Sequence, residues 1–407
     1  MRNKTILLII CMVVLSGCTP KKVIGTEPIS SQAEQKAEKV EEVLSEEDSS
    51  YVFGEEAVSE SEKGRKSKKI NIKAIGDIML GRGVAYHTKA DYTMPFKQTA
   101  EFLRSGDITF ANMEFTLSDR GQKLEGKINL RAEPKAVEGV NYAGIDVVNI
   151  ANNHIMDYNE VALIDTMEIL NQNNIKYIGA GKNLTDARNP AIIEVKGVKV
   201  GFLAYSDFAH YGFWDSPEKK NICYFWAKEN SSGVAPLTHQ DDKNGNPVKY
   251  ETGPIIEDIK KLRNQVDLIA VSFHWGVENS HNVPSLQREL GQDIIDAGAD
   301  MILGHHPHVL QGIEIYKGKP IIYSMGNFIF DQNERPNNEG MVVDMDFTDG
   351  KLSRLEVSPL QVVAKKETVF AKGDAAARIM GYIKKLSEEQ MNTMAQVNDG
   401  KLIFDIK

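Results

Sequence analysis

Short apolar runs that end at once in polar residues recur along the central part of this chain, and they limit its fold more than any other feature. The runs cover residues 69–75, 108–111, 146–151, 266–273 and 301–303. The first run alternates apolar and polar positions, a pattern typical of a strand. Helical patterns at 159–171 and 285–297 follow two of the runs. Strands that alternate with helices predict an α/β fold in which helices cover the sheets.

Two further segments predict antiparallel strands. Residues 191–205 hold two apolar runs around a Lys-Gly turn, and residues 340–363 contain an Asp-Gly pair, which is a strong hairpin signal. We therefore expect one α/β domain over residues 69–365, followed by a helical tail over residues 366–407. A chain of 407 residues, 42% of them hydrophobic, is long enough to bury a large core.

The first eighteen residues have the layout of a bacterial export signal. Arg2 and Lys4 precede an apolar run of about a dozen residues, the length of a signal core and too short to span a membrane. The run ends in Leu-Ser-Gly-Cys18, which resembles the lipobox of bacterial lipoproteins. We expect residues 1–18 to be a lipoprotein signal with its lipobox: the peptide before Cys18 is removed, Cys18 is lipidated, and the protein faces outward from the cell membrane. The alternatives are an uncleaved anchor and a plain signal peptide with a chance cysteine.

The segment after this signal has a different composition. Residues 19–68 are rich in Glu, Lys and Ser and hold few apolar positions, so they cannot bury enough surface to offset the entropy of ordering. We expect them to form a disordered tether. The formal net charge of −9 argues against binding nucleic acid by bulk electrostatics. The three cysteines, two of them within the first twenty residues, allow no disulfide framework.

Metal-binding residue types gather directly after the predicted strands. They are Asp77, Asn112, Glu114, Asn153, His154, His274, His305, His306 and His308. Ligands of α/β sheets bind outside the carboxyl ends of the strands, so we expect these side chains to converge. Imidazole, carboxylate and amide groups suit divalent metals such as Mn, Fe and Zn, whose preferences overlap too far to identify the ion.

Six motifs, in this order along the chain, resemble those of the CapA family of poly-γ-glutamate capsule biosynthesis proteins. They are Gly76-Asp-Ile-Met-Leu-Gly-Arg82, Asn112-Met-Glu114, Ala151-Asn-Asn-His154, His274-Trp-Gly276, Gly304-His-His-Pro-His308 and Tyr323-Ser-Met-Gly-Asn-Phe328. Each motif alone would be weak, and the resemblance covers roughly residues 69–335. The family is similar to calcineurin-like metallophosphoesterases, which implies a four-layer α/β/β/α sandwich with two divalent metal ions.

The resemblance also implies which residues bind metal. The positions that match metal ligands of the metallophosphoesterases are Asp77, Asn153, His274, His306 and His308. Glu114 stands where a bridging Asp is expected, and Met79 stands where those enzymes have a His. Because a thioether is a poor ligand for a hard metal, we expect one metal position to be weaker or to be filled differently.

Other residues have predicted roles beside the metals. His154 matches the His that contacts phosphate or protonates a leaving group, and Asp157 is expected to orient its ring. Arg82 is expected to hold an anionic oxygen as a fork donor. An Arg in a loop or an Asp near a helix start is often only a surface charge or a cap, which is the alternative for Arg82 and Asp157. The residues predicted to line the rim are Asn112, His305 and Asn327.

Two hypotheses for the function stay open at this point. In the first, the protein is a metal-dependent hydrolase outside the membrane that cleaves a phosphoester or an amide of a γ-linked glutamyl polymer. In the second, it is a non-catalytic part of a poly-γ-glutamate synthesis and export complex, with membrane capsule-synthesis proteins as partners and the polymer bound through metal. A cell-envelope metallophosphatase unrelated to capsule is the alternative assignment. The chain has no Walker-type ATP loop.

Overall fold

The computed structural model describes residues 67–125, 127–207, 210–211, 223–243, 247–332 and 334–406. The predicted export signal, the lipidation of Cys18 and all of the tether but Ser67 and Lys68 lie outside these residues. Within the described residues, no helix has both the length and the apolar character needed to cross a membrane.

A ten-stranded sheet forms one half of the ordered part of the chain. Its main path runs β23 (Ala395–Asn398), β24 (Lys401–Phe404), β21 (Lys351–Val363), β20 (Glu339–Thr348), β1 (Lys69–Ile78), β2 (Ile108–Met113), β5 (Val147–Asn149) and β6 (Lys176–Ile178). Two more strands pair beside this path, β19 (Asn327–Ile329) with β1 and β22 (Glu367–Phe370) with β21. The strands from β1 to β6 are parallel, which sets their carboxyl ends along one edge of the sheet.

A six-stranded sheet forms the other half. Its order is β17 (Ile313–Tyr316), β18 (Lys319–Ile322), β16 (Met301–His305), β15 (Leu268–His274), β9 (Val198–Ser206) and β8 (Ala191–Val195). The four central strands are parallel, and β8 and β17 close the sheet as antiparallel edges. The predicted Lys-Gly turn joins β8 to β9, and the predicted Asp-Gly turn joins β20 to β21.

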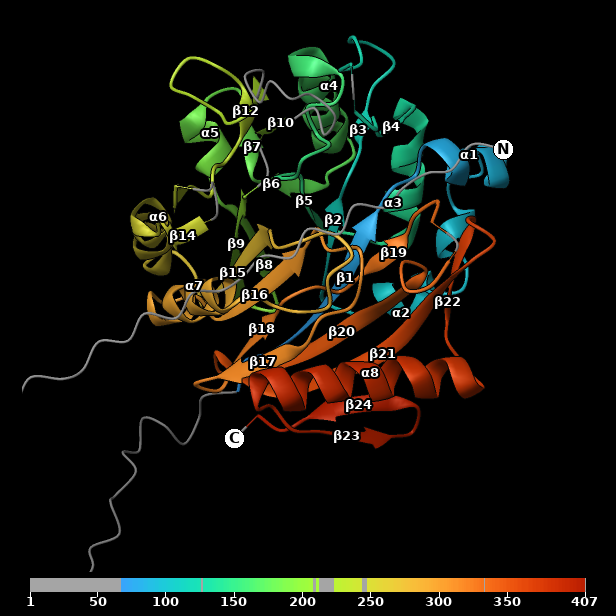
Figure 1. Cartoon of the computed structure of the whole chain (residues 1–407), viewed down its shortest axis with the longest axis vertical. Coiled ribbons are helices and arrows are strands. Elements are labelled where there is room, and N and C mark those ends of the chain that lie inside the picture. Colours follow the sequence, from blue (N-terminus) through green and yellow to red (C-terminus); the bar gives the residue numbers. More distant parts are fainter. Residues whose placement is uncertain are drawn as a thin grey trace, which may run out of the picture. The chain divides into compact units, whose positions relative to one another are not determined.

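The two sheets pack face to face (Figure 1). Phe110 of β2 stacks on Phe202 of β9 with 6.1 Å between the ring centroids. Asn149 of β5 donates its side-chain amide to the hydroxyl of Ser272 in β15 at 3.1 Å. Apolar side chains from both sheets belong to one buried cluster, so the space between the sheets is the main hydrophobic core.

Helices cover both outer faces. On the ten-stranded sheet, Thr109 donates its hydroxyl to the carbonyl of Leu103 in α2 (Ala100–Arg104). On the six-stranded sheet, α6 (Gly253–Arg263) packs so closely that a Cβ at Gly201 would lie 2.7 Å from Leu262. Next to it, Gly291 of α7 (Ser285–Asp296) lies against Ile321 of β18. The order of layers is therefore helix, sheet, sheet, helix, and the predicted four-layer α/β class is confirmed.

Shorter elements complete the fold. The remaining α-helices are α1 (Arg82–Thr88), α3 (Val137–Ala143), α4 (Asn159–Gln172), α5 (Leu184–Arg188) and α8 (Gly373–Met391), and the 3₁₀ turns are η2 (Met94–Phe96) and η3 (Pro134–Ala136). The remaining strands are β3 (Thr116–Leu117), β4 (Arg131–Ala132), β7 (Ala180–Gly181), β10 (His210–Tyr211), β11 (Cys223–Tyr224), β12 (Gly233–Val234), β13 (His239–Asp241) and β14 (Pro247–Tyr250).

The carboxyl-terminal segment differs from the predicted helical tail over 366–407. It holds one long helix, α8, but β22, β23 and β24 belong to the ten-stranded sheet. An Asp399-Gly400 turn joins β23 to β24, and Leu402 and Phe404 bury their side chains beside β21. The prediction of a separate helical tail is wrong because this hairpin completes the sheet that the domain begins.

Candidate metal centre

The pairing of the strands brings the predicted residues together. In the ten-stranded sheet, Asp77 at the end of β1 pairs with Asn112 of β2 and with Asn327 of β19. In the six-stranded sheet, His274 at the end of β15 pairs with His305 of β16. The 2.9 Å between His305 Nδ1 and Asp77 Oδ1 shows that the ends of both sets of strands meet at one place.

Two groups of ligand atoms share one carboxylate at this place. Glu114, His274 and His306 form the first group, and Asp77, Glu114 and His308 form the second. Within each group the nitrogen and oxygen atoms lie within 4.8 Å of one another, and every member is buried. A carboxylate shared by two ligand groups is the arrangement that two-metal sites use to join their ions.

Asn153 lies beside the first of these groups. Its Oδ1 is 2.9 Å from Nε2 of His274, so the amide oxygen faces the same space as the imidazole. The loop that carries Asn153 follows β5, and the side chain of Asn152 secures it: Oδ1 of Asn152 accepts hydrogen bonds from the backbone N–H groups of His154 and Ile155. The structure thus adds Asn153 to the ligand groups of acidic and His residues.

The polar atoms of the cluster fit a bound cation. Oε1 of Glu114 is buried and has no hydrogen bond to any described residue, and Nε2 of His308 and Nε2 of His274 lie 3.6 Å and 3.7 Å from it. A polar atom buried without a hydrogen-bond partner costs about 1–3 kcal/mol, and such atoms are rare in folded proteins. Carboxylate oxygen and imidazole nitrogen are ligands of divalent transition metals, so an ion held among these atoms would satisfy the Glu114 oxygen.

The pKa values of Asp77 and Glu114 are shifted in opposite directions. Burial acts to raise the pKa of Asp77, but hydrogen bonds and charge from His305 and His308 outweigh it and hold the pKa well below its ordinary value. Burial raises the pKa of Glu114 well above its ordinary value, and the negative charge of Asp77 adds to the rise. Glu114 therefore needs a nearby positive charge to stay ionised.

The pKa values of two imidazoles in the cluster are also shifted in opposite directions. Burial lowers the pKa of His274 well below its ordinary value, and His306 lowers it further, so His274 is neutral and has a lone pair free for a metal. Burial also acts to lower the pKa of His308, but Glu114 and Asp77 reverse the effect and raise the pKa to about 10. A cation that neutralised both carboxylates would remove the cause of that rise.

Backbone strain accompanies the turn that carries two of the ligands. His306 has φ of 100° and His308 has φ of 56°, with Pro307 between them. Residues with side chains seldom adopt positive φ, and such strain is concentrated at functional sites. The turn sets the ring of His306 4.7 Å from that of His274 and 6.1 Å from that of His308, measured between centroids.

The three residues predicted to line the rim lie in the floor of the cluster instead, so that prediction is wrong. Asn112, His305 and Asn327 are 0%, 1% and 0% exposed. Asn112 donates to Asp77 Oδ1 at 2.8 Å, and Oδ1 of Asn327 lies 3.0 Å from Nδ1 of His308. Their positions near the ends of β2, β16 and β19 point them at the ligands, which they hold in place.

Met79, the residue two positions after Asp77, lies in the hydrophobic core. Met79 is fully buried among core side chains, and its backbone N–H donates to the carbonyl of Ile329. No imidazole is present there, but His305 places one 2.9 Å from the same Asp77 carboxylate. The chain therefore lacks the His that the resemblance predicts at position 79, but it has an imidazole from β16 beside the same carboxylate.

His154 and Asp157 form a bonded pair at the edge of the cluster. Nδ1 of His154 lies 2.7 Å from Oδ2 of Asp157, which also accepts a hydrogen bond from the backbone N–H of Leu130 at 2.7 Å. The other ring nitrogen, Nε2, lies 4.0 Å from Oε1 of Glu114. Burial lowers the pKa of His154, and the charge of Asp157 opposes that change.

Lys127 is a neighbour of this pair that the sequence did not suggest. Its ammonium group lies 2.5 Å from Oδ1 of Asp157 and also donates to the backbone carbonyl of Asn153. The lysine comes from a polar loop without periodicity, so no pattern pointed to it. Arg82, in contrast, forms an ion pair with Asp331 at 3.1 Å, and among the described residues it shows no contact with the cluster.

Comparison with known proteins gives a consistent result. The model of the bacterial capsule synthesis protein family PGA_cap matches residues 71–332. Capsule biosynthesis protein CapA of Bacillus anthracis is 33% identical over 309 residues, which are 74% of this chain and 69% of that protein. PGA biosynthesis protein CapA of Bacillus subtilis (strain 168) is 32% identical over 336 residues, 82% of this chain and 81% of that protein.

Solved structures show only a distant likeness. A hypothetical protein from Thermus thermophilus superposes with a TM-score of 0.41 and 12% identity, over 72% of this chain and all of that one. A putative 5'-nucleotidase from Staphylococcus aureus superposes with a TM-score of 0.37 and 14% identity, over 78% of this chain and 58% of that one. Similarity at this level carries no argument about the site.

Proposed function

Because this chain belongs to the bacterial capsule synthesis protein family PGA_cap, we propose that it acts in the synthesis or export of a poly-γ-glutamate capsule through a metal centre. The matched residues 71–332 include every member of the metal cluster. The lipobox-like sequence before Cys18 supports a lipid anchor that holds the domain on the outer side of the cell membrane. Membrane capsule-synthesis proteins would then be its partners.

The observation that carries this proposal is the shared Glu114 carboxylate. Asp77, Glu114 and His308 would hold one divalent ion, and Glu114, His274 and His306 with Asn153 would hold a second. Bound there, the ions would supply positive charge and Lewis acidity to an anionic ligand. This is what a protein with a net charge of −9 needs in order to attract a polycarboxylate.

The protein's own groups would orient and protonate that ligand. Asp157 holds Nδ1 of His154, which fixes the ring and leaves Nε2 on the side of Glu114. A ring held in this way can pass a proton to or from a ligand atom at Nε2. Asn112 and Asn327 keep Asp77 and His308 in position while the ligand binds.

The second candidate function is turnover. A metal-dependent phosphoesterase or γ-glutamyl hydrolase of the cell envelope, unrelated to capsule assembly, would use the same cluster. The His154–Asp157 pair favours this function, because binding a polymer through metal does not require an oriented proton donor.

One experiment tests both functions. The purified chain would be assayed for bound metals, for binding of poly-γ-glutamate and for cleavage of a generic phosphodiester and of the polymer, each with and without EDTA and added Mn²⁺. Polymer binding that disappears with EDTA supports the proposal. Equal binding by metal-free protein contradicts it, and cleavage that survives EDTA or His306→Ala contradicts the second function.

A further inference from the structure

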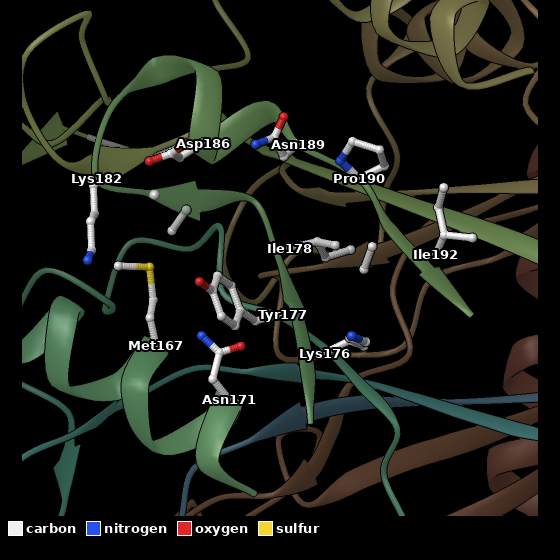
Figure 2. Close-up of a pocket in the computed structure, with 13 residues that line it drawn as sticks. Met167, Asn171, Lys176, Tyr177, Ile178, Lys182, Asp186, Asn189, Pro190 and Ile192 are labelled. Carbon is white, nitrogen blue, oxygen red and sulfur yellow. The ribbon is translucent and has the colours of Figure 1, made fainter. Parts of the chain in front are cut away.

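A cavity of about 460 Å³ lies where the edges of the two sheets come together, apart from the metal cluster (Figure 2). Tyr177 lines it from β6, the last strand of the ten-stranded sheet, and Ile192 lines it from β8, the last strand of the six-stranded sheet. None of its lining residues belongs to the cluster. Its volume falls within the range of about 300–1,000 Å³ typical of ligand sites. We call it the edge cavity.

The edge cavity is rich in hydrogen-bond donors that have no partner in the described part of the chain. Figure 2 shows the ammonium group of Lys182, the phenol of Tyr177 and the amide of Asn171 around one opening. These three groups, and the side chains of Lys176 and Asn189, make no hydrogen bond or ion pair with any described residue.

One carboxylate also lines the edge cavity, and it is already engaged. Oδ2 of Asp186 accepts a hydrogen bond from the side chain of Asn183 at 3.0 Å. With two lysines and one aspartate, the lining carries a net charge of +1 on a protein whose overall charge is −9. The chemistry of the free groups therefore suits an anion that also carries amide groups, since the two asparagines can both donate and accept.

A second cavity extends the space beyond the reach of one small molecule. It has a volume of about 380 Å³ and shares Asn189 and Pro190 with the edge cavity. Lys261 of α6 lines it and makes no ion pair with any described residue, whereas Arg188 and Asp258, which also line it, pair with each other at 2.7 Å. Together the two cavities give an extended ligand a path with cationic side chains along it.

The edge cavity is linked to the metal cluster through neighbouring strands. Its strand β6 pairs with β5, and the chain that leaves β5 leads to Asn153. Directly after β6, Gly179 approaches this loop so closely that a Cβ on it would lie 2.4 Å from the Cβ of Ala151. The segment that lines the edge cavity therefore contacts the loop that carries Asn153.

We propose that the edge cavity binds a stretch of poly-γ-glutamate. Lys176 and Lys182 pair with carboxylates of the polymer, and Asn171 and Asn189 bond to its amide groups. This assignment rests on the proposed function. An acidic protein can then retain a polyanion, because the lysines of the cavity attract the polymer locally although the net charge of the protein is negative.

The test compares two double variants of the full chain. Binding of fluorescein-labelled poly-γ-glutamate would be followed by fluorescence anisotropy at low and high NaCl for Lys176→Gln with Lys182→Gln. We expect about tenfold weaker binding and a smaller dependence on salt, because two screened charges are lost. The matched control is Lys351→Gln with Lys372→Gln, two exposed lysines away from the cavities that also lack ion pairs within the described chain; it should bind as the wild type does.

The outcomes separate this proposal from the one on which it rests. Absence of polymer binding by the wild-type chain would contradict the proposed function itself. Metal-dependent binding by the wild type with equal binding by the Lys176/Lys182 variant would overturn only the edge cavity. A single-stranded DNA oligonucleotide that competes as well as unlabelled polymer would also overturn it, because the assignment depends on carboxylate and amide groups together. Circular dichroism spectra that match the wild type would confirm that both variants are folded.

Discussion

The metal cluster and the edge cavity present polar groups in opposite ways. In the cluster, Asp77, Glu114 and His274 are fully buried, and the amide of Asn112 donates to both carboxylates. In the edge cavity, Lys176 and Lys182 are exposed and have no partner among the described residues. Buried polar groups are rigid and depend on one another, whereas exposed lysines adapt to a ligand at little structural cost. The first region suits an ion of fixed geometry, and the second suits a flexible chain.

The largest effect is expected from the residue that both ligand groups share. Glu114→Gln should lower the affinity of both ligand groups for divalent metal by at least about 100-fold, because it removes the negative charge common to the two groups. Metal content after dialysis, measured by elemental analysis, checks this. Glu125→Gln, at an exposed loop position, is the control and should retain metal. Loss of only one ion from Glu114→Gln would show that the carboxylate does not join the two positions.

A smaller effect is expected from a residue that holds a predicted ligand in place. Asn112→Ala removes the amide that donates to Asp77 at 2.8 Å, and it should weaken metal binding by about 10–100-fold. Competition with a fluorescent chelator measures the affinity. An affinity equal to that of the wild type would mean that Asn112 only fills space, and the distinction between ligands and supporting residues would have to be redrawn.

A pH effect is expected at Asp207, which follows β9, the strand between β15 of the cluster and β8 of the edge cavity. Burial raises the pKa of Asp207 to about 6, against opposing effects from His239 and Tyr250. The folded state thus binds the proton more tightly than the unfolded state does. Its contribution to stability is present below the unfolded pKa near 4 and is lost as the pH rises toward 6.

Replacing that carboxyl should remove this loss. Between pH 4 and pH 6.5 we expect the unfolding free energy of the wild type to fall by roughly 2–3 kcal/mol relative to that of Asp207→Asn. Urea unfolding in EDTA across this range measures the difference. Asp241→Asn, which changes an exposed partner of His239, is the control. Parallel pH profiles for wild type and Asp207→Asn would contradict the assignment.

The smallest effect is expected from the edge cavity. Lys176→Gln with Lys182→Gln should leave metal content unchanged and should alter the unfolding free energy by less than about 0.5 kcal/mol, as surface substitutions usually do. Urea unfolding and elemental analysis check both expectations. A large loss of stability or of metal would show that the two regions are coupled through the Gly179 contact.

Much of the fold could be predicted because its signals are local. The strand patterns at 69–75, 108–111 and 266–273 and the helix pattern at 159–171 all correspond to elements of the structure. The hairpin of β23 and β24 could not be predicted because it is held in the sheet by pairing with β21, more than thirty residues earlier. The export signal and the lipidation of Cys18 stay predictions.

The site shows the same division. The metal-binding residue types stand in the sequence directly after apolar strands, so their common location followed from the rule that parallel strands end at one edge. The direction in which each side chain points could not be predicted from the sequence. His305 faces Asp77, Arg82 turns to Asp331, and Lys127 reaches Asp157 from a loop without pattern.

The sequence by itself determined the α/β class and the set of residues that could bind metal, because these depend on periodicity and on residue type at strand ends. Six ordered motifs carried the resemblance to the family, which implied the four layers. Only the tertiary structure decided that Glu114 is shared, that Asn112, His305 and Asn327 lie beneath the ligands, and that two sheet edges enclose a cationic cavity. The physical reason is that a contact between distant segments depends on strand register and on the packing of two sheets, and neither leaves a local mark in the chain.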